Sequence, residues 1–244
     1  MTVDFSAPET LAAVAIAAVA GVVRGVTGFG GAMVMTPPLA LLFGPRLAVP
    51  IVLLLESFAA TPMLVQTRQD VRWRVILPIA AFACLTVPIG GYVLLTAEPQ
   101  TLRRAIAAFV IVFAFLMLRG WRYAGPQRTL TAAGLGAVAG AMLGATSIGG
   151  PPVILYLLAG PDRIETTRAN LTLFVAVSSL AGIVMLWASG VLGFAALWMG
   201  LLLAPGYYLG VLAGSRLFLR FNDIRFRQFT LLLMIVVSMG VLLA

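Results

Sequence analysis

Two glycine-rich stretches carry most of the residues in this chain that could bind a ligand. Residues 25–31 read GVTGFGG and residues 144–150 read GATSIGG, so that Gly, Thr, Gly and Gly recur 119 residues apart. Glycine lets the backbone approach a ligand closely. A helix that begins after such a stretch offers free N–H groups and the positive end of its dipole, and both attract anions. The pattern therefore predicts an anion site at these stretches.

The apolar runs that follow the two stretches, 31–43 and 150–159, are too short to cross a bilayer, which takes about 20 residues. We expect half-helices that begin inside the membrane, where irregular backbone is tolerated only beside a protein cavity. Alternatively, the glycines only permit close helix packing. We prefer the binding interpretation because the break occurs twice, in register, with a hydroxyl each time. The predicted substrate-binding residues are Arg24, Thr27, Gly28, Gly30, Gly31, Thr146, Ser147, Gly149 and Gly150.

Arg24 lies one turn before the first stretch, inside an apolar segment. A basic group at that depth is costly and usually faces a cavity or a partner. There it could hold an anion through two parallel hydrogen bonds. The alternative is an arginine that snorkels to the membrane surface from a helix nearer the interface.

Glu56 is the only carboxylate deep in a long apolar segment, 47–66. It could couple transport to protons, because an ionisable residue inside the membrane usually has a function. Alternatively, it pairs with Arg24 and has no transport role. The matching region of the second half carries Ser178 and Ser179, so the two halves differ here.

Two tyrosines and the single cysteine also lie inside apolar segments. Tyr207 and Tyr208 follow Pro205 in the middle of a long apolar segment. Buried tyrosine hydroxyls need partners, so one of them could face the cavity, although packing beside the proline explains the pair equally well. Cys84, the only cysteine, is expected to be a small apolar filler.

The amino-acid composition indicates whether water or lipid surrounds the chain. Hydrophobic residues make up 61% of the 244 residues and charged residues 10%, whereas soluble domains have about a quarter charged. One water-soluble core could not hide so much apolar surface, so lipid must surround much of the chain. The absence of His and the single cysteine exclude a His/Cys metal site and a disulfide framework. We expect no metal, no cofactor and no enzymatic activity, because common catalytic bases and nucleophiles are missing.

The apolar runs number ten and are separated by Arg, Pro and Gly. The runs at 47–66, 75–96, 169–188 and 194–218 are long enough for a full crossing. The complete series lies at about 10–26, 31–43, 47–66, 75–96, 101–118, 129–145, 150–159, 169–188, 194–218 and 226–243.

The paired stretches divide the chain into two repeats of five helical segments, 9–121 and 129–244, joined by a cytoplasmic linker, 122–128. If each stretch turns the chain back, as a re-entrant hairpin or as two crossings, the repeats are inverted. Twelve of the sixteen arginines then gather on one membrane face and three on the other, against six and nine for parallel repeats. The positive-inside rule favours the inverted arrangement. We predict an all-α polytopic membrane protein of two inverted repeats, whose broken or re-entrant helices meet near the bilayer midplane.

The doubled motif resembles the TauE/SafE family of sulfite and organosulfonate membrane transporters. The resemblance lies in residues 25–31 with Thr36-Pro37-Pro38, and in Gly144 to Pro152, and it extends over nearly the whole chain. It implies transport of sulfite, sulfoacetate or similar anions, often as export. The family pattern assigns no role to Arg24 or Glu56, whose interpretation depends on their depth.

These observations predict a multi-pass secondary transporter of the bacterial inner membrane. Its expected solute is a small anion such as sulfite, sulfoacetate or another organosulfonate or organic acid. The chain has no Gly-x-x-x-x-Gly-Lys motif and no Lys, so a gradient must supply the energy. The alternatives are a passive anion channel and a membrane scaffold subunit. The candidate partners are the anionic solute, the lipid bilayer and a second copy in a homodimer, and nucleic acid is not expected.

Overall fold

The structure is a computed structural model that describes residues 8–125, 128–220 and 224–243. These residues form ten α-helices and one 3-10 helix, and no strand occurs among them. In chain order they are α1 (Pro8–Thr27), α2 (Gly31–Phe43), α3 (Pro45–Thr67), η1 (Arg68–Asp70), α4 (Trp73–Thr96), α5 (Pro99–Leu118), α6 (Thr129–Thr146), α7 (Gly150–Leu157), α8 (Ile164–Ala188), α9 (Phe194–Arg220) and α10 (Ile224–Leu243).

Each predicted apolar segment corresponds to one of these α-helices. The largest difference is in α8, which begins at Ile164, whereas the apolar run begins at residue 169. Glu165 in its first turn complements the positive end of the helix dipole, so the polar residues before the apolar run extend the helix. Prediction from hydropathy shortened this helix because it read polar residues at a membrane surface as loop.

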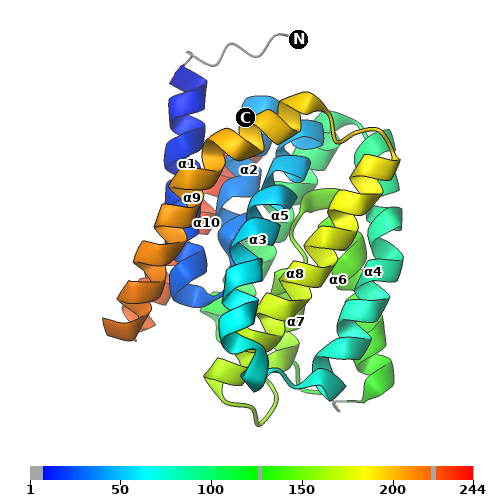
Figure 1. The fold of residues 1–244 in the computed structure, drawn as a ribbon, viewed down its shortest axis with the longest axis vertical. Coiled ribbons are helices and arrows are strands. Elements are labelled where there is room, and N and C mark those ends of the chain that lie inside the picture. The colour runs from blue at the N-terminus through cyan, green and yellow to red at the C-terminus, as the bar shows by residue number, and fades with distance from the viewer. Residues whose placement is uncertain (1–7, 126–127, 221–223, 244) are drawn as a thin grey trace.

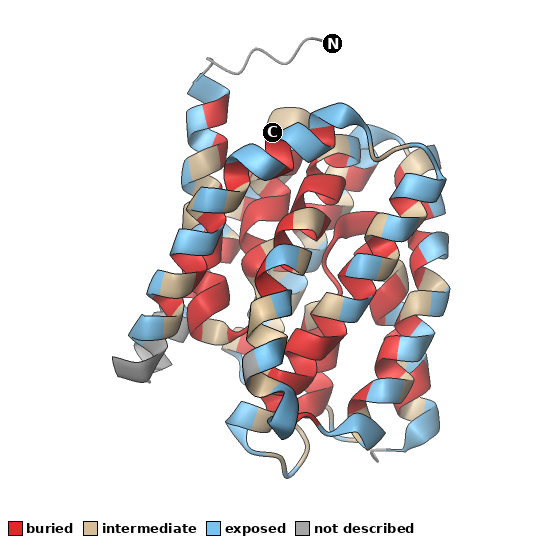
Figure 2. Ribbon diagram, viewed as in Figure 1, coloured by how far each residue is buried: buried red, intermediate tan, exposed pale blue. Residues whose placement is uncertain are grey.

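The outer surface of the bundle has the apolar character that lipid requires. Seven of the described helices are long and apolar enough to cross a membrane, by length and composition. Large apolar side chains such as Leu130 and Phe194 are exposed, at 84% and 79%. Figure 2 shows that exposed residues follow the outward faces of the helices while the inward faces are buried. Soluble monomers rarely expose apolar surface on this scale, and the chain is a multi-pass membrane protein.

The helices pack in pairs around a central pair. Figure 1 shows α1 beside α9 on one flank, α4 beside α6 on the other, and α3 and α8 between them. α5 packs against α10. The flanking pairs approach closely through glycine. A Cβ at Gly214 on α9 would lie 2.2 Å from the Val22 carbonyl oxygen, and one at Gly144 on α6 would lie 2.2 Å from that of Val87.

Close packing therefore accounts for the first glycine of each glycine-rich stretch. A Cβ at Gly25 would lie 2.2 Å from the carbonyl oxygen of Val211 on α9. Gly25 and Gly144 hold the flanking pairs together, as the packing interpretation expects. In the first stretch, Gly28 and Gly30 interrupt the helix instead, because they have φ of 78° and 88°, which L side chains rarely adopt.

The two interruptions turn the chain back, so that α1 with α2 and α6 with α7 form two hairpins inside the bundle (Figure 1). α7 is buried from Pro151 to Leu157, and most of α2 is buried as well (Figure 2). The links between helices lie at two opposite ends of the bundle. At one end Arg72 pairs with Asp162, and at the other Arg46 donates a 2.7 Å hydrogen bond to the Leu95 carbonyl oxygen.

Candidate functional site

The two glycine-rich breaks border one narrow cavity between α1, α2, α3, α6, α7 and α8. Its wall contains Gly30 from the first break and Gly149 and Gly150 from the second. Residues of both breaks therefore line the same cavity. The cavity measures about 20 Å³, enough for about one water molecule. The wall also includes Arg24, Phe29, Glu56, Leu143, Ser147, Val175 and Ser179.

Arg24 is the cation of this cavity. It is 1% exposed, so it does not snorkel to the membrane surface. Its Nη1 donates a 2.9 Å hydrogen bond to the Gly28 carbonyl oxygen, and its Nε lies 3.4 Å from Oε2 of Glu56. Nε and Nη2 have no hydrogen-bond partner among the described residues. Buried donors are nearly always satisfied, so this edge of the guanidinium, where Glu56 is the only charged neighbour that pairs with it among the described residues, is the part of Arg24 that a ligand could contact.

Glu56 faces Arg24 from α3 and is 3% exposed. The Tyr207 hydroxyl on α9 donates a 2.8 Å hydrogen bond to Glu56 Oε1. A Cβ at Gly31 would lie 2.5 Å from that same carboxylate oxygen, so Gly31 lets α2 pack directly against the pair. The geometry fits the pairing of Glu56 with Arg24 that the sequence left open, while the coupling role stays a prediction.

Thr27 and Thr146 make the same local bonds at the ends of α1 and α6. The Thr27 hydroxyl donates to the Val23 carbonyl oxygen over 2.8 Å, and the Thr146 hydroxyl donates to that of Met142 over 2.7 Å. Each hydroxyl also accepts the N–H of the residue two positions on. These bonds satisfy backbone groups that a helix end leaves free. Both side chains therefore shape the breaks and lie outside the cavity wall.

Ser147 closes the second break through a contact that the sequence did not indicate. Its backbone has φ of 60°, in the left-handed region, where the first break has Gly28. The Ser147 hydroxyl lies 2.8 Å from the hydroxyl of Thr36, and both side chains are buried. Thr36 lies in the middle of α2, so the tip of the second hairpin contacts the side of the first.

Arg168 is a second residue whose position the sequence did not reveal. It is one of the twelve arginines that the inverted arrangement places on one membrane face. In the structure its Nη2 donates a 3.1 Å hydrogen bond to the Gly25 carbonyl oxygen, and its Nε lies 2.8 Å from where a Cβ of Gly28 would stand. It is the last residue of the helical extension of α8 that hydropathy missed, so no sequence signal placed it beside the first break.

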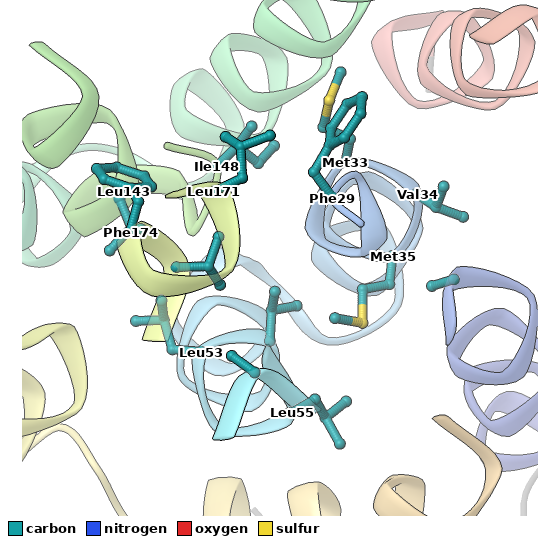
Figure 3. Close-up of a cluster of buried hydrophobic side chains, with 14 of the residues drawn as sticks. Phe29, Met33, Val34, Met35, Leu53, Leu55, Leu143, Ile148, Leu171 and Phe174 are labelled. Atoms are coloured by element: carbon teal, nitrogen blue, oxygen red, sulfur yellow. The ribbon is translucent and has the colours of Figure 1, made fainter. Parts of the chain in front are cut away.

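The arrangement can bind an anion but offers little for covalent chemistry. Of the ten predicted site residues, the cavity wall contains Arg24, Gly30, Glu56, Ser147, Gly149 and Gly150 and excludes Thr27, Gly28, Gly31 and Thr146. Figure 3 shows the apolar remainder of the site, with Phe29 and Met33 of the first hairpin on one side and Leu143 and Ile148 of the second on the other. Within the described residues, no group of His, Cys, Asp and Glu could hold a metal ion.

One family comparison matches the chain. The model of the family described as Sulfite exporter TauE/SafE matches residues 13–241, which include both hairpins and the Arg24–Glu56 pair. The resemblance found in the glycine-rich motifs is confirmed by this match. Comparisons with the curated proteins and with the solved structures find no match.

Proposed function

We propose that this chain, which belongs to the sulfite exporter TauE/SafE family, is a secondary transporter that carries a small anion across the bacterial inner membrane. The family consists of membrane exporters of sulfite and organosulfonates. The observation that carries the proposal is Arg24, a buried guanidinium with two nitrogens that make no hydrogen bond among the described residues, on a cavity bordered by two helix breaks. A buried cation of this kind is costly to keep in a membrane without a functional role.

The chemistry of Arg24 favours an oxyanion with several oxygens on one atom. A guanidinium presents N–H donors in a planar fork that matches such oxygens two at a time. Nε and Nη2, which make no hydrogen bond among the described residues, lie on the same edge of that fork, and Glu56 Oε2 is 3.4 Å from Nε. Sulfite and the sulfonate group of an organosulfonate both provide adjacent oxygens at the required spacing. A carboxylate fits the fork as well, so the family match decides: we propose sulfite or an organosulfonate as the substrate, with organic acids as the alternative ligands.

The size of the cavity favours a carrier over an open pore. About one water fits in the space that an anion would occupy, so a hairpin must move before the anion binds. We propose that repeats 9–121 and 129–244 are inverted and that the linker 122–128 joins them. The exchange of partners supports this, since α1 packs along α9 just as α6 packs along α4. Inverted repeats typically provide alternating access to a site at their interface.

Glu56 provides a route for coupling to protons. In the structure the Glu56 carboxylate is the counter-ion of Arg24. An arriving anion would place a second negative charge against the same guanidinium, and the two anions would repel each other at low dielectric. A proton on Glu56 removes that repulsion. We propose that anion binding and protonation of Glu56 occur together, so that one proton accompanies the anion.

A ligand-binding panel on purified protein tests the proposal. Sulfite, an alkyl sulfonate, a carboxylate and phosphate are each added at two pH values while thermal unfolding is followed. A ligand at a hundred times its dissociation constant stabilises the native state by about 2.7 kcal/mol. We expect sulfite or the sulfonate to raise the melting temperature most, and to do so more strongly at the lower pH.

Two variants make this panel specific for the site. Replacing Arg24 alone would leave the Glu56 carboxylate buried without a partner, so both are changed together, as Arg24→Gln with Glu56→Gln. The control is Arg163→Gln, which removes an arginine whose side chain is 86% exposed. The anion response should disappear in the double variant and persist in the control. Equal responses in wild type and double variant would place the anion elsewhere.

A further inference from the structure

A separate cleft opens at the arginine-rich end of the bundle, between the end of α3, the start of α8 and the end of α9. Its volume is about 370 Å³, far larger than the central cavity. Its charged lining residues are Asp70, Glu165, Arg168 and Arg216. Three of them are exposed at its mouth, whereas Arg168 is half-buried and packs against the first hairpin.

Gly28, at the tip of the first hairpin, contacts one lining residue of the cleft and one of the central cavity. Arg168, which lines the cleft, packs against the Cα of Gly28. Arg24, which lines the cavity, bonds the carbonyl oxygen of that same Gly28. The guanidinium groups of Arg168 and Arg24 thus both lie against Gly28, the first from the cleft and the second from the central cavity. Gly28 and Gly30 both have positive φ, so the tip of the hairpin consists of residues with wide backbone freedom.

We propose that Arg168 is the gate between the cleft and the central cavity, and the first guanidinium that a small oxyanion meets on its way to Arg24. This proposal rests on the transport function proposed above. In the closed arrangement, the Arg168 hydrogen bond to the Gly25 carbonyl oxygen holds the hairpin tip against α8. An anion that binds Arg168 competes for the same N–H donors and frees the tip to move.

The charges of the cleft fit a passage with a single deep cation. Asp70 and Glu165 balance Arg168 and Arg216, so the mouth as a whole has little net attraction for anions. Arg163 shares Glu165, whose carboxylate lies 3.6 Å from the Arg163 Nε. Arg168 is the cation at the inner wall of the cleft, beside the tip that must open.

Thiol labelling tests the gate without any measurement of transport. In a Cys84→Ser background, Ser179→Cys places a reporter on the wall of the central cavity, where Ser179 is 1% exposed. A neutral, membrane-impermeant methanethiosulfonate is applied to the arginine-rich face of oriented membrane vesicles, so that the charge of Arg168 does not itself attract the reagent. We expect slow labelling with Arg168 present and labelling about tenfold faster in Arg168→Ala, the factor for losing one charge-assisted hydrogen bond. Labelling from the opposite face should not change.

The matched control is Arg163→Ala, which removes the same charge from the same end without touching the hairpin. Ser215→Cys, on the cleft wall, reports whether the cleft is intact. If Arg168→Ala changes the labelling of Ser215→Cys, the comparison is made with Arg168→Lys, which keeps the positive charge but loses the planar set of N–H donors. We expect Ser179→Cys to be labelled at an intermediate rate in that variant. Equal labelling in Arg168→Ala and Arg163→Ala overturns the gate while leaving the transport function standing. Faster labelling in a protein that binds no anion in the panel above overturns the function and leaves the gate.

Discussion

The two glycine-rich breaks share local hydrogen bonds but contribute different chemistry to the cavity. Thr27 and Thr146 close equivalent helix ends with equivalent hydrogen bonds, and both breaks reach the same cavity. Yet the position 119 residues after Arg24 is Leu143, which lines the cavity as an apolar side chain. The doubled break therefore creates the space, and one half alone supplies the charge. A second buried guanidinium would add a large desolvation cost beside the first.

The second half contributes by holding the charged pair rather than by repeating it. Tyr207 reaches from α9 to Glu56, and Arg168 reaches from α8 to the tip of the first hairpin. The first half in turn contributes Thr36 to the tip of the second hairpin. Each half thus fixes the break of the other, which is the arrangement needed if movement of one half against the other is to open the site.

The largest effect is expected from giving the first half the residue that the second half has. Arg24→Leu removes the cation, and we expect anion flux into proteoliposomes to fall by about 10² to 10³-fold, as for loss of one partner from a buried charge pair. Arg46→Leu is the control, since Arg46 is exposed and bonds only the Leu95 carbonyl oxygen among the described contacts. An anion flux in Arg24→Leu close to that in Arg46→Leu would contradict the proposal that the first half alone supplies the cation that binds the anion.

The next effect concerns the coupling assigned to Glu56. Glu56→Gln keeps the shape of the side chain and an acceptor for Tyr207, but it cannot exchange a proton. We expect anion exchange at equal pH to persist, while accumulation driven by a pH gradient is lost. One proton per anion gives about tenfold accumulation per pH unit. Isotope uptake with and without a pH gradient measures both, and gradient-driven accumulation by Glu56→Gln would remove Glu56 from the coupling step.

A smaller effect is expected from exchanging the residues at the two tips. Gly28→Ser puts a Cβ at φ of 78° and 2.8 Å from the Arg168 Nε, and should destabilise the fold by about 2 kcal/mol. Ser147→Gly relieves the same backbone strain but loses the bond to Thr36, so its net effect should be within about 0.5 kcal/mol. Melting temperatures compare the two, and equal values would show that the tips are interchangeable.

The smallest effect should be the same in both halves. Thr27→Val and Thr146→Val each remove one hydroxyl that satisfies backbone groups at a helix end. We expect each to lower the free energy of unfolding by about 1 kcal/mol. Thermal unfolding of the two variants side by side checks this. If the losses in unfolding free energy of the two variants differ by more than the experimental error, the two hydroxyls do not stabilise their breaks equally.

Much of the fold follows from the sequence because it depends on local properties. Apolar run length predicts helices that cross lipid, and Gly and Pro mark where they stop. The recurrence of the glycine stretch at a fixed spacing predicted two breaks and one shared pocket, and residues of both breaks line one cavity in the structure. The start of α8 was predicted too late, because polar residues at a membrane surface form helix as readily as loop.

Tertiary structure decided which side chains meet. Depth in an apolar run singled out Arg24 and Glu56, but their pairing depends on how α1 and α3 are rotated about their own axes. Composition could not place Arg168 against Gly28 or Thr36 against Ser147, because residues more than a hundred positions apart meet only once the helices have packed. By itself, the sequence determined the solvent, the helices and the breaks, which are set by neighbours along the chain. The partners of each polar group were set by how helices that are distant in the sequence pack against one another.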